Sequence, residues 1–328
     1  MHHQQPQSNS PKNNAYPCSS GIATNNSHVS GLVQTLEHRR FAEFCDGCRR
    51  YGYIGLCYGP PGVGKTLSSR HYSNWDSIST TGRWTNEYLD VDLSTLFYTP
   101  SVVNSPGKIE TDIRHARDRL ALLARRPLHL EAQAKRESIR QRDKEHDARA
   151  FLDHDWLTDG PIPQPQPTYG KVAEEYGRKE LQIGDPTTLI VIDEADRLRM
   201  ASLEQVRAVF DAGEIGLILV GMPGLEKRLA RYPQFYSRIG FVHEFRPLGA
   251  AEVRQLLEQH WAPPRVNLPD KLLEPETIAV IIRITGGNFR LLNRLLTQIE
   301  RILEINSLDE VTQAVVEAAR ESLVIGQT

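Results

Sequence analysis

The sequence predicts an α/β protein in which a parallel β-sheet is flanked by helices and followed by a domain made only of helices. Short apolar runs alternate with helical patterns over residues 53–247, which is typical of a parallel sheet. A glycine-rich turn, GPPGVGKT at 59–66, joins the first apolar run to a helical pattern. From Leu248 onward only helical patterns follow, with breaks at 262–269 and 285–288.

The composition excludes several classes of protein. The 328 residues include 39 Lys and Arg and 41 Asp and Glu, a net charge of -2, which excludes a strongly basic nucleic-acid protein but allows local basic patches. No apolar run reaches the roughly 18 residues of a transmembrane helix, and the N-terminus lacks the apolar segment of a secretory signal. Four cysteines are too few for a disulfide framework, so we expect a cytoplasmic protein without membrane contact.

The elements follow from composition and spacing. Residues 1–28 are rich in Gln, Asn, Ser and Pro and predict a disordered tail. Apolar residues at helical spacing from Val29 predict a helix to about Arg50. Five buried strands are expected at 53–58, 95–99, 188–193, 216–221 and 241–247. Further helices are expected after the glycine-rich turn to about Ser73, at 201–211 and at 224–231. The α/β domain would therefore span 29–247 and the helical domain 248–328.

A charged insertion separates the second and third strands, at about 107–185. Residues 108–149 carry many charges in a helical pattern, and the Pro-rich segment 160–167 reads as a linker. Two interpretations stay open. The segment is either a solvated helical hairpin or a surface that faces DNA or a partner, whose Lys and Arg would contact phosphates. Aromatic residues do not interleave with the basic ones, so we expect no readout of base sequence.

The glycine-rich turn fits the pattern G-x-x-x-x-G-K-[ST]. In this pattern the backbone N–H groups of the turn and the N-terminus of the next helix surround phosphates. Lys65 would reach the β and γ phosphates of ATP, and Thr66 would hold Mg²⁺. The candidate contacts are Gly59, Pro60, Pro61, Gly62, Val63, Gly64, Lys65 and Thr66. A plain Gly/Pro turn is the alternative, and the strand–turn–helix context disfavours it.

A second motif, LIVIDEAD at 189–196, ends the third strand with acidic residues. Ligands of open α/β sheets bind at the carboxyl ends of the strands. There Asp193 would hold Mg²⁺ through water, and Glu194 would polarise the water that attacks ATP. The alternative is an acidic helix cap that follows a strand, which the phosphate-binding turn makes less attractive.

With these motifs the chain resembles the AAA+ ATPases and, more narrowly, the TnsC, TniB and MuB family of transposition regulators. The resemblance covers about 30–75 and 186–320 and rests on GPPGVGKT, IDEADRL, LVGMPGLEKRL, YSRIG and TGGNFR. It implies an ATPase, stimulated by DNA or a partner, that forms a ring or helical filament on double-stranded DNA through backbone contacts. Its partners would be a transposase and a target-selection protein. ExeA/GspA-type secretion ATPases share most of these motifs, so a secretion-associated or STAND-type ATPase that does not act on DNA is the alternative.

The resemblance also assigns roles to arginines. Arg238, in YSRIG, occupies the place of an arginine finger that serves the nucleotide of a neighbouring subunit, with Arg231 and Arg228 as the next candidates. Arg290, in TGGNFR, resembles the lid arginine that reaches the nucleotide of its own subunit, with Arg294 one helical turn further. The alternatives are a surface arginine at 238 and an ordinary helix-face arginine at 290.

One position departs from the family pattern. The fourth strand of the family usually ends in a polar residue, often Thr or Asn, and this chain has Met222 there. A methionine cannot orient water through a hydrogen bond. The departure therefore predicts slow hydrolysis or another residue in this role.

The cysteines give a weaker signal. Cys45 and Cys48 form CDGC, and a zinc site would need two more ligands. Cys57 falls in the first strand and Cys18 in the tail. We therefore favour buried thiols over zinc.

Overall fold

The computed structural model describes residues 33–81, 89–152, 168–264, 266–269 and 273–323. The predicted tail at 1–28 and the Pro-rich segment at 160–167 lie outside the described residues. No helix in the described part of the chain has the length and apolar character that crossing a membrane requires.

Five strands form one sheet in the order β2-β3-β4-β1-β5, and every neighbouring pair is parallel. The strands are β1 (Ile54–Tyr58), β2 (Thr95–Tyr98), β3 (Leu189–Ile192), β4 (Gly216–Gly221) and β5 (Ile239–Glu244). The predicted fifth strand, 241–247, was displaced toward the C-terminus. Ile239 already pairs with Ile54, and Pro247 has no N–H with which to continue a ladder.

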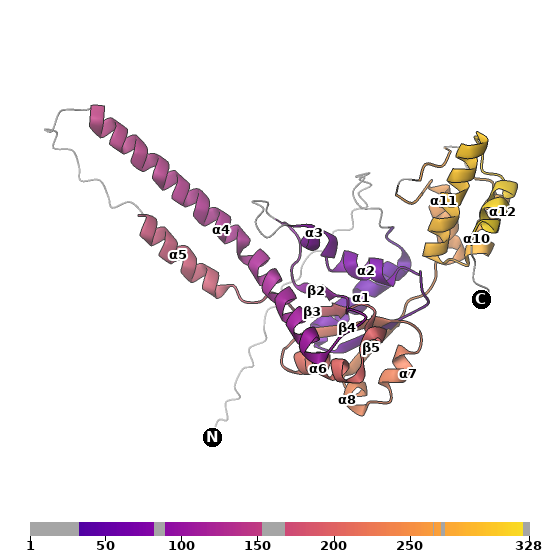
Figure 1. Cartoon of the computed structure of the whole chain (residues 1–328), viewed down its shortest axis with the longest axis horizontal. Helices are drawn as coiled ribbons and strands as arrows, with labels where there is room; N and C mark the ends of the chain where they lie inside the picture. The colour runs from indigo at the N-terminus through magenta and orange to yellow at the C-terminus, as the bar shows by residue number, and fades with distance from the viewer. Residues whose placement is uncertain (1–32, 82–88, 153–167, 265, 270–272, 324–328) are drawn as a thin grey trace, which may run out of the picture. The chain divides into compact units, whose positions relative to one another are not determined.

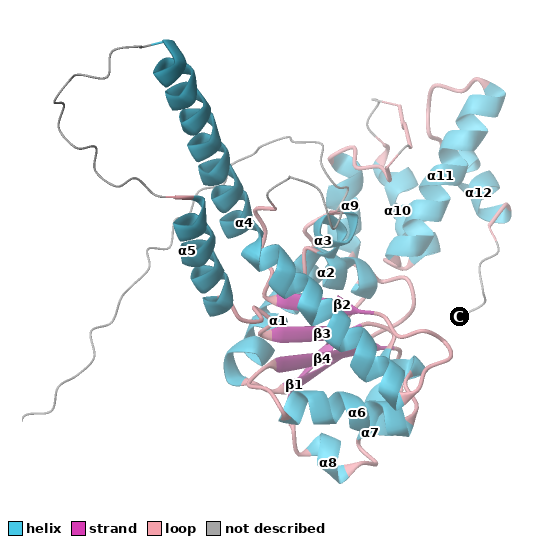
Figure 2. Ribbon diagram, turned by 60° about the vertical axis from the view of Figure 1, so that its left-hand side comes forward, coloured by secondary structure: helices cyan, strands magenta, loops and turns pink. Residues whose placement is uncertain are grey.

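Alternate residues of the strands supply two separate cores, because successive side chains point to opposite faces of a sheet. On β3, Ile190 and Ile192 belong to one core, and Leu189 and Val191 belong to the other. The first core includes Leu203 of α6 (Met200–Asp211), and the second includes Phe41 of α1 (Leu36–Tyr51). Figure 2 shows the strands among the surrounding helices. Burial on both faces explains why these strands read as continuous apolar runs rather than alternating patterns.

The helices close to the sheet are α1 (Leu36–Tyr51), α2 (Lys65–Tyr72), α3 (Trp75–Thr80), α6 (Met200–Asp211), α7 (Leu225–Leu229) and α8 (Pro233–Tyr236). A 3-10 turn, η1 (Ala195–Arg197), follows β3. The first helix begins later than the predicted Val29 because the Thr35 side chain caps it by accepting the His38 N–H at 3.1 Å. Helices α3 and α8 were not predicted, since six and four residues are too few to show periodicity.

The insertion is helical, as predicted. It consists of α4 (Pro106–Leu152) and α5 (Tyr169–Gln182), which lie side by side (Figure 1). Their common core contains Ala132, Ile139, Val172 and Tyr176. The helical interpretation of 108–149 is therefore confirmed. We call α4 and α5 the α4–α5 hairpin; a surface that faces DNA or a partner stays a prediction.

The C-terminal part contains only helices in its described residues. These are α9 (Ala250–Glu258), α10 (Pro275–Thr285), α11 (Phe289–Asn306) and α12 (Gln313–Glu321), and they share a hydrophobic core of their own. The predicted break at 285–288 is confirmed between α10 and α11. Gly287 takes φ 74°, and a Cβ there would lie 1.9 Å from the Leu248 carbonyl oxygen, so only glycine fits. A domain boundary at 247/248 stays a prediction.

Candidate functional site

The glycine-rich turn connects the carboxyl end of β1 to the N-terminus of α2, as predicted. Gly62 and Gly64 take φ values of 83° and 111°, which side chains rarely adopt. A Cβ at Gly59 would lie 2.2 Å from the Phe245 carbonyl oxygen. Val63 points into the apolar core. The turn is therefore built from backbone that glycine alone permits, with one apolar anchor.

Lys65 is largely buried, with 9% of its surface exposed. Its ammonium donates to the carbonyl oxygens of Gly59 at 2.6 Å and Pro60 at 2.8 Å. Burial lowers the pKa of Lys65, while the negative charges of Asp193 and Asp196 act in the opposite direction. A buried ammonium held by carbonyl oxygens can exchange these partners for phosphate oxygens.

Asp193 lies directly after β3 and is 3% exposed. Its Oδ1 accepts the Glu194 N–H at 2.9 Å, and the Thr66 hydroxyl donates to the same carboxylate. Burial raises the pKa of Asp193, and these hydrogen bonds only partly offset that effect. The structure thus brings together Asp193, Thr66 and Lys65, as the sequence predicted. Lys65 and Asp193 are 128 positions apart in the chain (193 − 65).

Glu194 adopts φ 51°, a left-handed conformation that is uncommon for a residue other than glycine. Its carboxylate forms an ion pair with Arg197. The Arg197 Nη1 also donates to the Pro100 carbonyl oxygen, just after β2, at 3.1 Å. The carboxylate that the sequence assigned to water activation is therefore engaged by a cation.

A carboxylate lies against the backbone at the end of β4. Asp196 Oδ2 accepts the Met222 N–H at 2.7 Å. A Cβ at Gly221 would lie 2.6 Å from the same oxygen, so Asp196 fills the space beside this glycine. Asp196 was not among the predicted site residues, although the final Asp of IDEAD was the available signal.

The described C-terminal helices reach the phosphate-binding turn through α11. The Arg290 N–H donates to the Gly62 carbonyl oxygen at 2.9 Å, and Asn288 Nδ2 donates to the Pro61 carbonyl oxygen at 2.9 Å. The Arg290 side chain is exposed and close enough for its charge to lower the pKa of Lys65. Arg294, which is also exposed, lies one helical turn after Arg290 in α11. Arg290 therefore lies beside the phosphate-binding turn, and its role toward the nucleotide stays a prediction.

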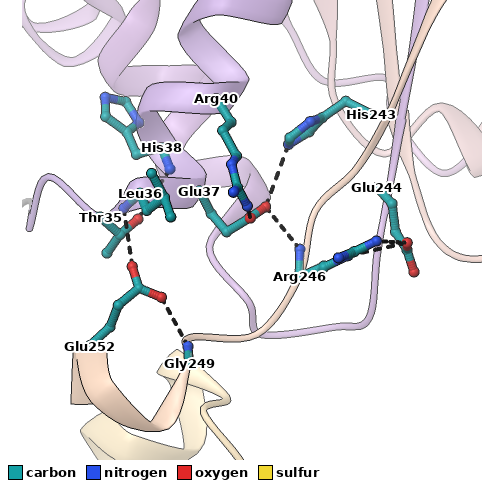
Figure 3. A network of polar contacts seen from close by, with 10 residues as sticks. All are labelled: Thr35, Leu36, Glu37, His38, Arg40, His243, Glu244, Arg246, Gly249 and Glu252. Atoms are coloured by element: carbon teal, nitrogen blue, oxygen red, sulfur yellow. Dashed lines mark hydrogen bonds and ion pairs between the residues drawn. The ribbon is translucent and has the colours of Figure 1, made fainter. Parts of the chain in front are cut away.

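A second polar network joins the start of α1 to the segment between β5 and α9 (Figure 3). The buried carboxylate of Glu37 accepts the Arg246 N–H at 3.2 Å and an Arg40 N–H at 2.9 Å. Glu252 accepts from the backbone N–H groups of Leu36 at 3.1 Å and Gly249 at 2.9 Å. Two carboxylates therefore tie α1 to the connection that leads from the sheet into the C-terminal helices.

His243 faces the same network. Its Nε2 lies 3.7 Å from Glu37 Oε2 and is buried without a hydrogen-bond partner among the described residues. Its ring stacks on Phe44. Burial lowers the pKa of His243 more than the nearby Glu37 carboxylate raises it, so the neutral imidazole is favoured.

Arg238 lies at the other end of the sheet. Its carbonyl oxygen accepts from Ile54 at the start of β1, whereas the phosphate-binding turn follows the end of that strand. Its guanidinium forms two bonds with Asp211, with Nε to Oδ1 at 2.7 Å and Nη2 to Oδ2 at 3.1 Å. Arg238 therefore lies away from the phosphate-binding turn of its own chain, and its guanidinium is bound to Asp211. Its role as an arginine finger stays a prediction.

The two fallback arginines differ. Arg228 donates to the carbonyl oxygens of Asp196 and Leu198, which fixes the turn after β3, whereas Arg231 is exposed. Arg228 is thus committed to a structural contact and is a poor candidate for a finger.

The cysteines of the described residues are buried. Cys45, Cys48 and Cys57 lie in the core between α1 and the sheet. Burial raises the pKa of the Cys48 thiol to about 12 and that of the other two as well. Within the described ranges no group of three or more His, Cys, Asp or Glu could hold a metal ion. The thiols of Cys45 and Cys48 are buried, as predicted, and pack among apolar groups.

The comparisons with known proteins agree with this geometry. A family model described as an AAA domain matches residues 48–229. A Staphylococcus aureus protein described as a "Potential ATP-binding protein" is 39% identical over 306 residues, which cover 90% of this chain and 97% of that protein. Neither description names a transposition regulator, so that part of the resemblance stays a prediction.

Solved structures share the fold. ORC2 of Aeropyrum pernix, in ADPNP–ADP complexes, has a TM-score of 0.50 at 15% identity, covering 91% of this chain and 70% of that chain. The RuvB Holliday junction branch migration motor of Thermotoga maritima has a TM-score of 0.49 at 15% identity, covering 89% and 70%. At such identities the ORC2 similarity supports the AAA+ fold and nothing further.

Proposed function

Because the chain belongs to the AAA domain family, we propose that its phosphate-binding turn binds ATP with Mg²⁺ and that the site hydrolyses ATP to ADP and phosphate. The observation that carries the proposal is the meeting of Lys65, Thr66 and Asp193 at the carboxyl end of the sheet. Each is the residue type that phosphates or a magnesium ion require.

The oxygen atoms of Asp193 and Thr66 fit Mg²⁺. Asp193 is a nearly inaccessible carboxylate whose pKa is raised by burial, and the Thr66 hydroxyl adds a second hard oxygen. Mg²⁺ prefers such ligands and keeps several waters, so Asp193 and Thr66 would hold it. When bound, Mg²⁺ would neutralise charge on the phosphates. Binding would also relieve the unfavourable burial of the Asp193 charge.

The protein residues have separate tasks in this proposal. Lys65 would leave the carbonyl oxygens of Gly59 and Pro60 and bind the β and γ phosphates. Glu194 would accept a proton from the attacking water once its carboxylate is free of Arg197. Asp196, beside Met222, would take part in holding that water. We expect slow hydrolysis because the proton acceptor is engaged by a cation in the unstimulated protein.

We further propose that the ATP-bound chain assembles on double-stranded DNA and regulates transposition, with a transposase and a target-selection protein as partners. The motifs quoted above and the basic residues of α4 support this proposal. Only some of these residues are available, since Arg119 donates to the carbonyl oxygens of Ile78 and Thr81 and Arg125 donates to that of Ile183. The exposed Arg114 and Arg140 are therefore two of the candidates for phosphate contacts.

An ATPase assay with and without duplex DNA tests this proposal. We expect DNA to stimulate ATP hydrolysis by the wild type. The affinity of the protein for DNA should fall by about one log unit per log unit of salt concentration for each phosphate contacted. The double variant Arg114→Gln/Arg140→Gln should lose part of the stimulation, while Glu137→Gln, an exposed residue of the same helix, should keep all of it. Absence of stimulation and of binding at low salt would favour the secretion-associated or STAND-type alternative.

Assembly is tested through Arg238. The variants Arg238→Ala and Lys65→Ala should each be inactive alone, the first without a finger and the second without a working nucleotide site. Mixed oligomers would contain interfaces at which an intact site meets an intact Arg238, and these should recover activity. A finger in trans is worth roughly 10³-fold or more, so partial recovery is measurable. If confirmed mixed oligomers stay inactive, the Asp211 pair of Arg238 is structural and Arg231 becomes the candidate.

A further inference from the structure

The first residues of α11 lie directly against the phosphate-binding turn. A Cβ at Gly62 would be 2.5 Å from Asn288 Oδ1 and 2.9 Å from Arg290 Cβ. Two hydrogen bonds cross this contact, from Arg290 N–H to Gly62 O and from Asn288 Nδ2 to Pro61 O, each 2.9 Å long. No side chain other than hydrogen fits at position 62 while α11 stays in this place.

These two bonds complete a series along the turn. The carbonyl oxygens of Gly59 and Pro60 accept from Lys65, and the next two, of Pro61 and Gly62, accept from the start of α11. In the proposed function Lys65 leaves its two carbonyl oxygens for the phosphates. The two hydrogen bonds from α11 to the carbonyl oxygens of Pro61 and Gly62 would then still hold the backbone of the turn.

Asn288 makes this connection with both ends of one amide group. Its Oδ1 accepts the Leu291 N–H at 3.2 Å and so caps α11, while its Nδ2 donates to Pro61. Ser, Thr and Asp also cap helices through a side-chain oxygen. Among the capping residues only Asn adds an N–H₂ group beside the capping oxygen, so the cap alone does not account for the contact with the turn.

We propose that Asn288 is a positioning residue that fixes the start of α11 on the phosphate-binding turn and thereby sets the place of Arg290 relative to the nucleotide. This inference rests on the proposed function of the site. Arg290 follows Asn288 by two residues, and its backbone is bonded to Gly62, so a shift of the cap displaces the arginine directly.

The test uses Asn288→Ser in the full chain. Serine retains a capping oxygen and adds no charge, but it is too short to cap Leu291 and reach Pro61 together. We expect unchanged helix content by circular dichroism and a fall of about three- to tenfold in ATP affinity or turnover, as the loss of one hydrogen bond implies. The matched control is Thr312→Ala, because Thr312 caps α12 through Val315 without touching the turn. It should leave ATP affinity and turnover unchanged.

A double-mutant cycle separates positioning from a general loss of stability. If Asn288 acts through Arg290, Asn288→Ser should change the same kinetic parameter as Arg290→Ala, and it should add less than about twofold when Arg290 is already Ala. Two results would overturn the inference. One is wild-type ATP affinity and turnover in Asn288→Ser, and the other is a double variant whose loss equals the product of the two single-variant losses. Failure of the proposed function gives a different result, since the wild type itself would then bind no ATP.

Discussion

The phosphate-binding end of the sheet and the α4–α5 hairpin are held together in different ways. At the turn, positive φ values and the contact with Phe245 exclude any residue but glycine at several positions. In the hairpin, Ile139, Val172 and a few neighbours form a small apolar core that many other sequences could supply. The first region therefore has a sequence that identifies its chemistry, whereas the second has a sequence that identifies only its helices.

The contrast extends to charge. The phosphate-binding end of the sheet buries Lys65 and Asp193. Burial lowers the pKa of Lys65 and raises that of Asp193, so that each neutral form is favoured. The hairpin carries its charges on the surface, as in the pair of Lys179 with Glu175 at 2.7 Å, and such exposed pairs contribute little to stability. Unfavourable burial is thus concentrated where we propose that ATP and Mg²⁺ bind, as expected of a functional site.

The largest effect should come from Glu194→Gln. Glutamine has nearly the same shape but cannot accept the proton, so turnover should fall by about 10²- to 10⁴-fold while ATP still binds. The variant should trap the assembled, DNA-bound state. Phosphate release and ATP binding are measured side by side, with Glu137→Gln of the hairpin as the control. Hydrolysis at the normal rate would place the base elsewhere.

Next in size is Ile139→Ala in the hairpin core. Truncation of a buried isoleucine costs about 2–5 kcal/mol, but the hairpin can open without the sheet. We expect amide hydrogen exchange over 169–182 to speed up at least about tenfold while ATP affinity is unchanged. Gln133→Ala, at an exposed position of the same helix, should alter neither. A loss of ATP affinity would mean that the two regions are coupled more tightly than their separate cores indicate.

Asp193→Asn should change stability less than Ile139→Ala does, and it should stabilise the protein instead of destabilising it. The raised pKa means that the folded state holds the charged carboxylate at a disadvantage at pH 7. Removing the charge should stabilise the nucleotide-free protein by about 0.5–2 kcal/mol and weaken Mg²⁺-dependent ATP binding. Urea unfolding without nucleotide measures the first effect. A destabilised variant would show that the hydrogen bonds of the carboxylate outweigh its burial.

Mild acid should produce the smallest effect, and it should come from the sheet rather than the hairpin. Burial lowers the pKa of His38 and His243, so below about pH 6.5 the unfolded chain takes up protons that the folded chain does not. Stability should therefore fall as the pH drops from 7 toward the lowered folded-state values. Urea unfolding at pH 7 and at a pH below about 6.5 should show a smaller fall in the free energy of unfolding for His243→Gln than for the wild type. His129→Gln, whose parent side chain is 68% exposed, should match the wild type.

Most of the fold could be predicted because the strands are short, apolar and separated by clear helical patterns. The turn at 59–66 and the acidic end of β3 are local motifs, so Lys65, Thr66 and Asp193 could be placed together before the structure was considered. The start of α1 was predicted too early, because apolar residues at helical spacing also precede the Thr35 cap.

Contacts between distant segments could not be predicted in the same way. Asp196 at the Met222 amide, Asn288 at the Pro61 carbonyl oxygen and Asp211 at Arg238 each depend on how separate elements pack. No spacing rule relates these pairs, which are 26, 227 and 27 residues apart. The family resemblance suggested roles for Arg238 and Arg290 but gave no indication of the partners that hold them.

The central claim, that ATP binding belongs to the phosphate-binding turn and not to the hairpin, is tested most directly by calorimetric titration of ATP in the presence of Mg²⁺. The wild type and Ile139→Ala should bind with the same affinity, and Lys65→Ala should show no binding at concentrations that saturate the wild type. Because Lys65 is the cation assigned to the β and γ phosphates, wild-type affinity in Lys65→Ala would contradict the account.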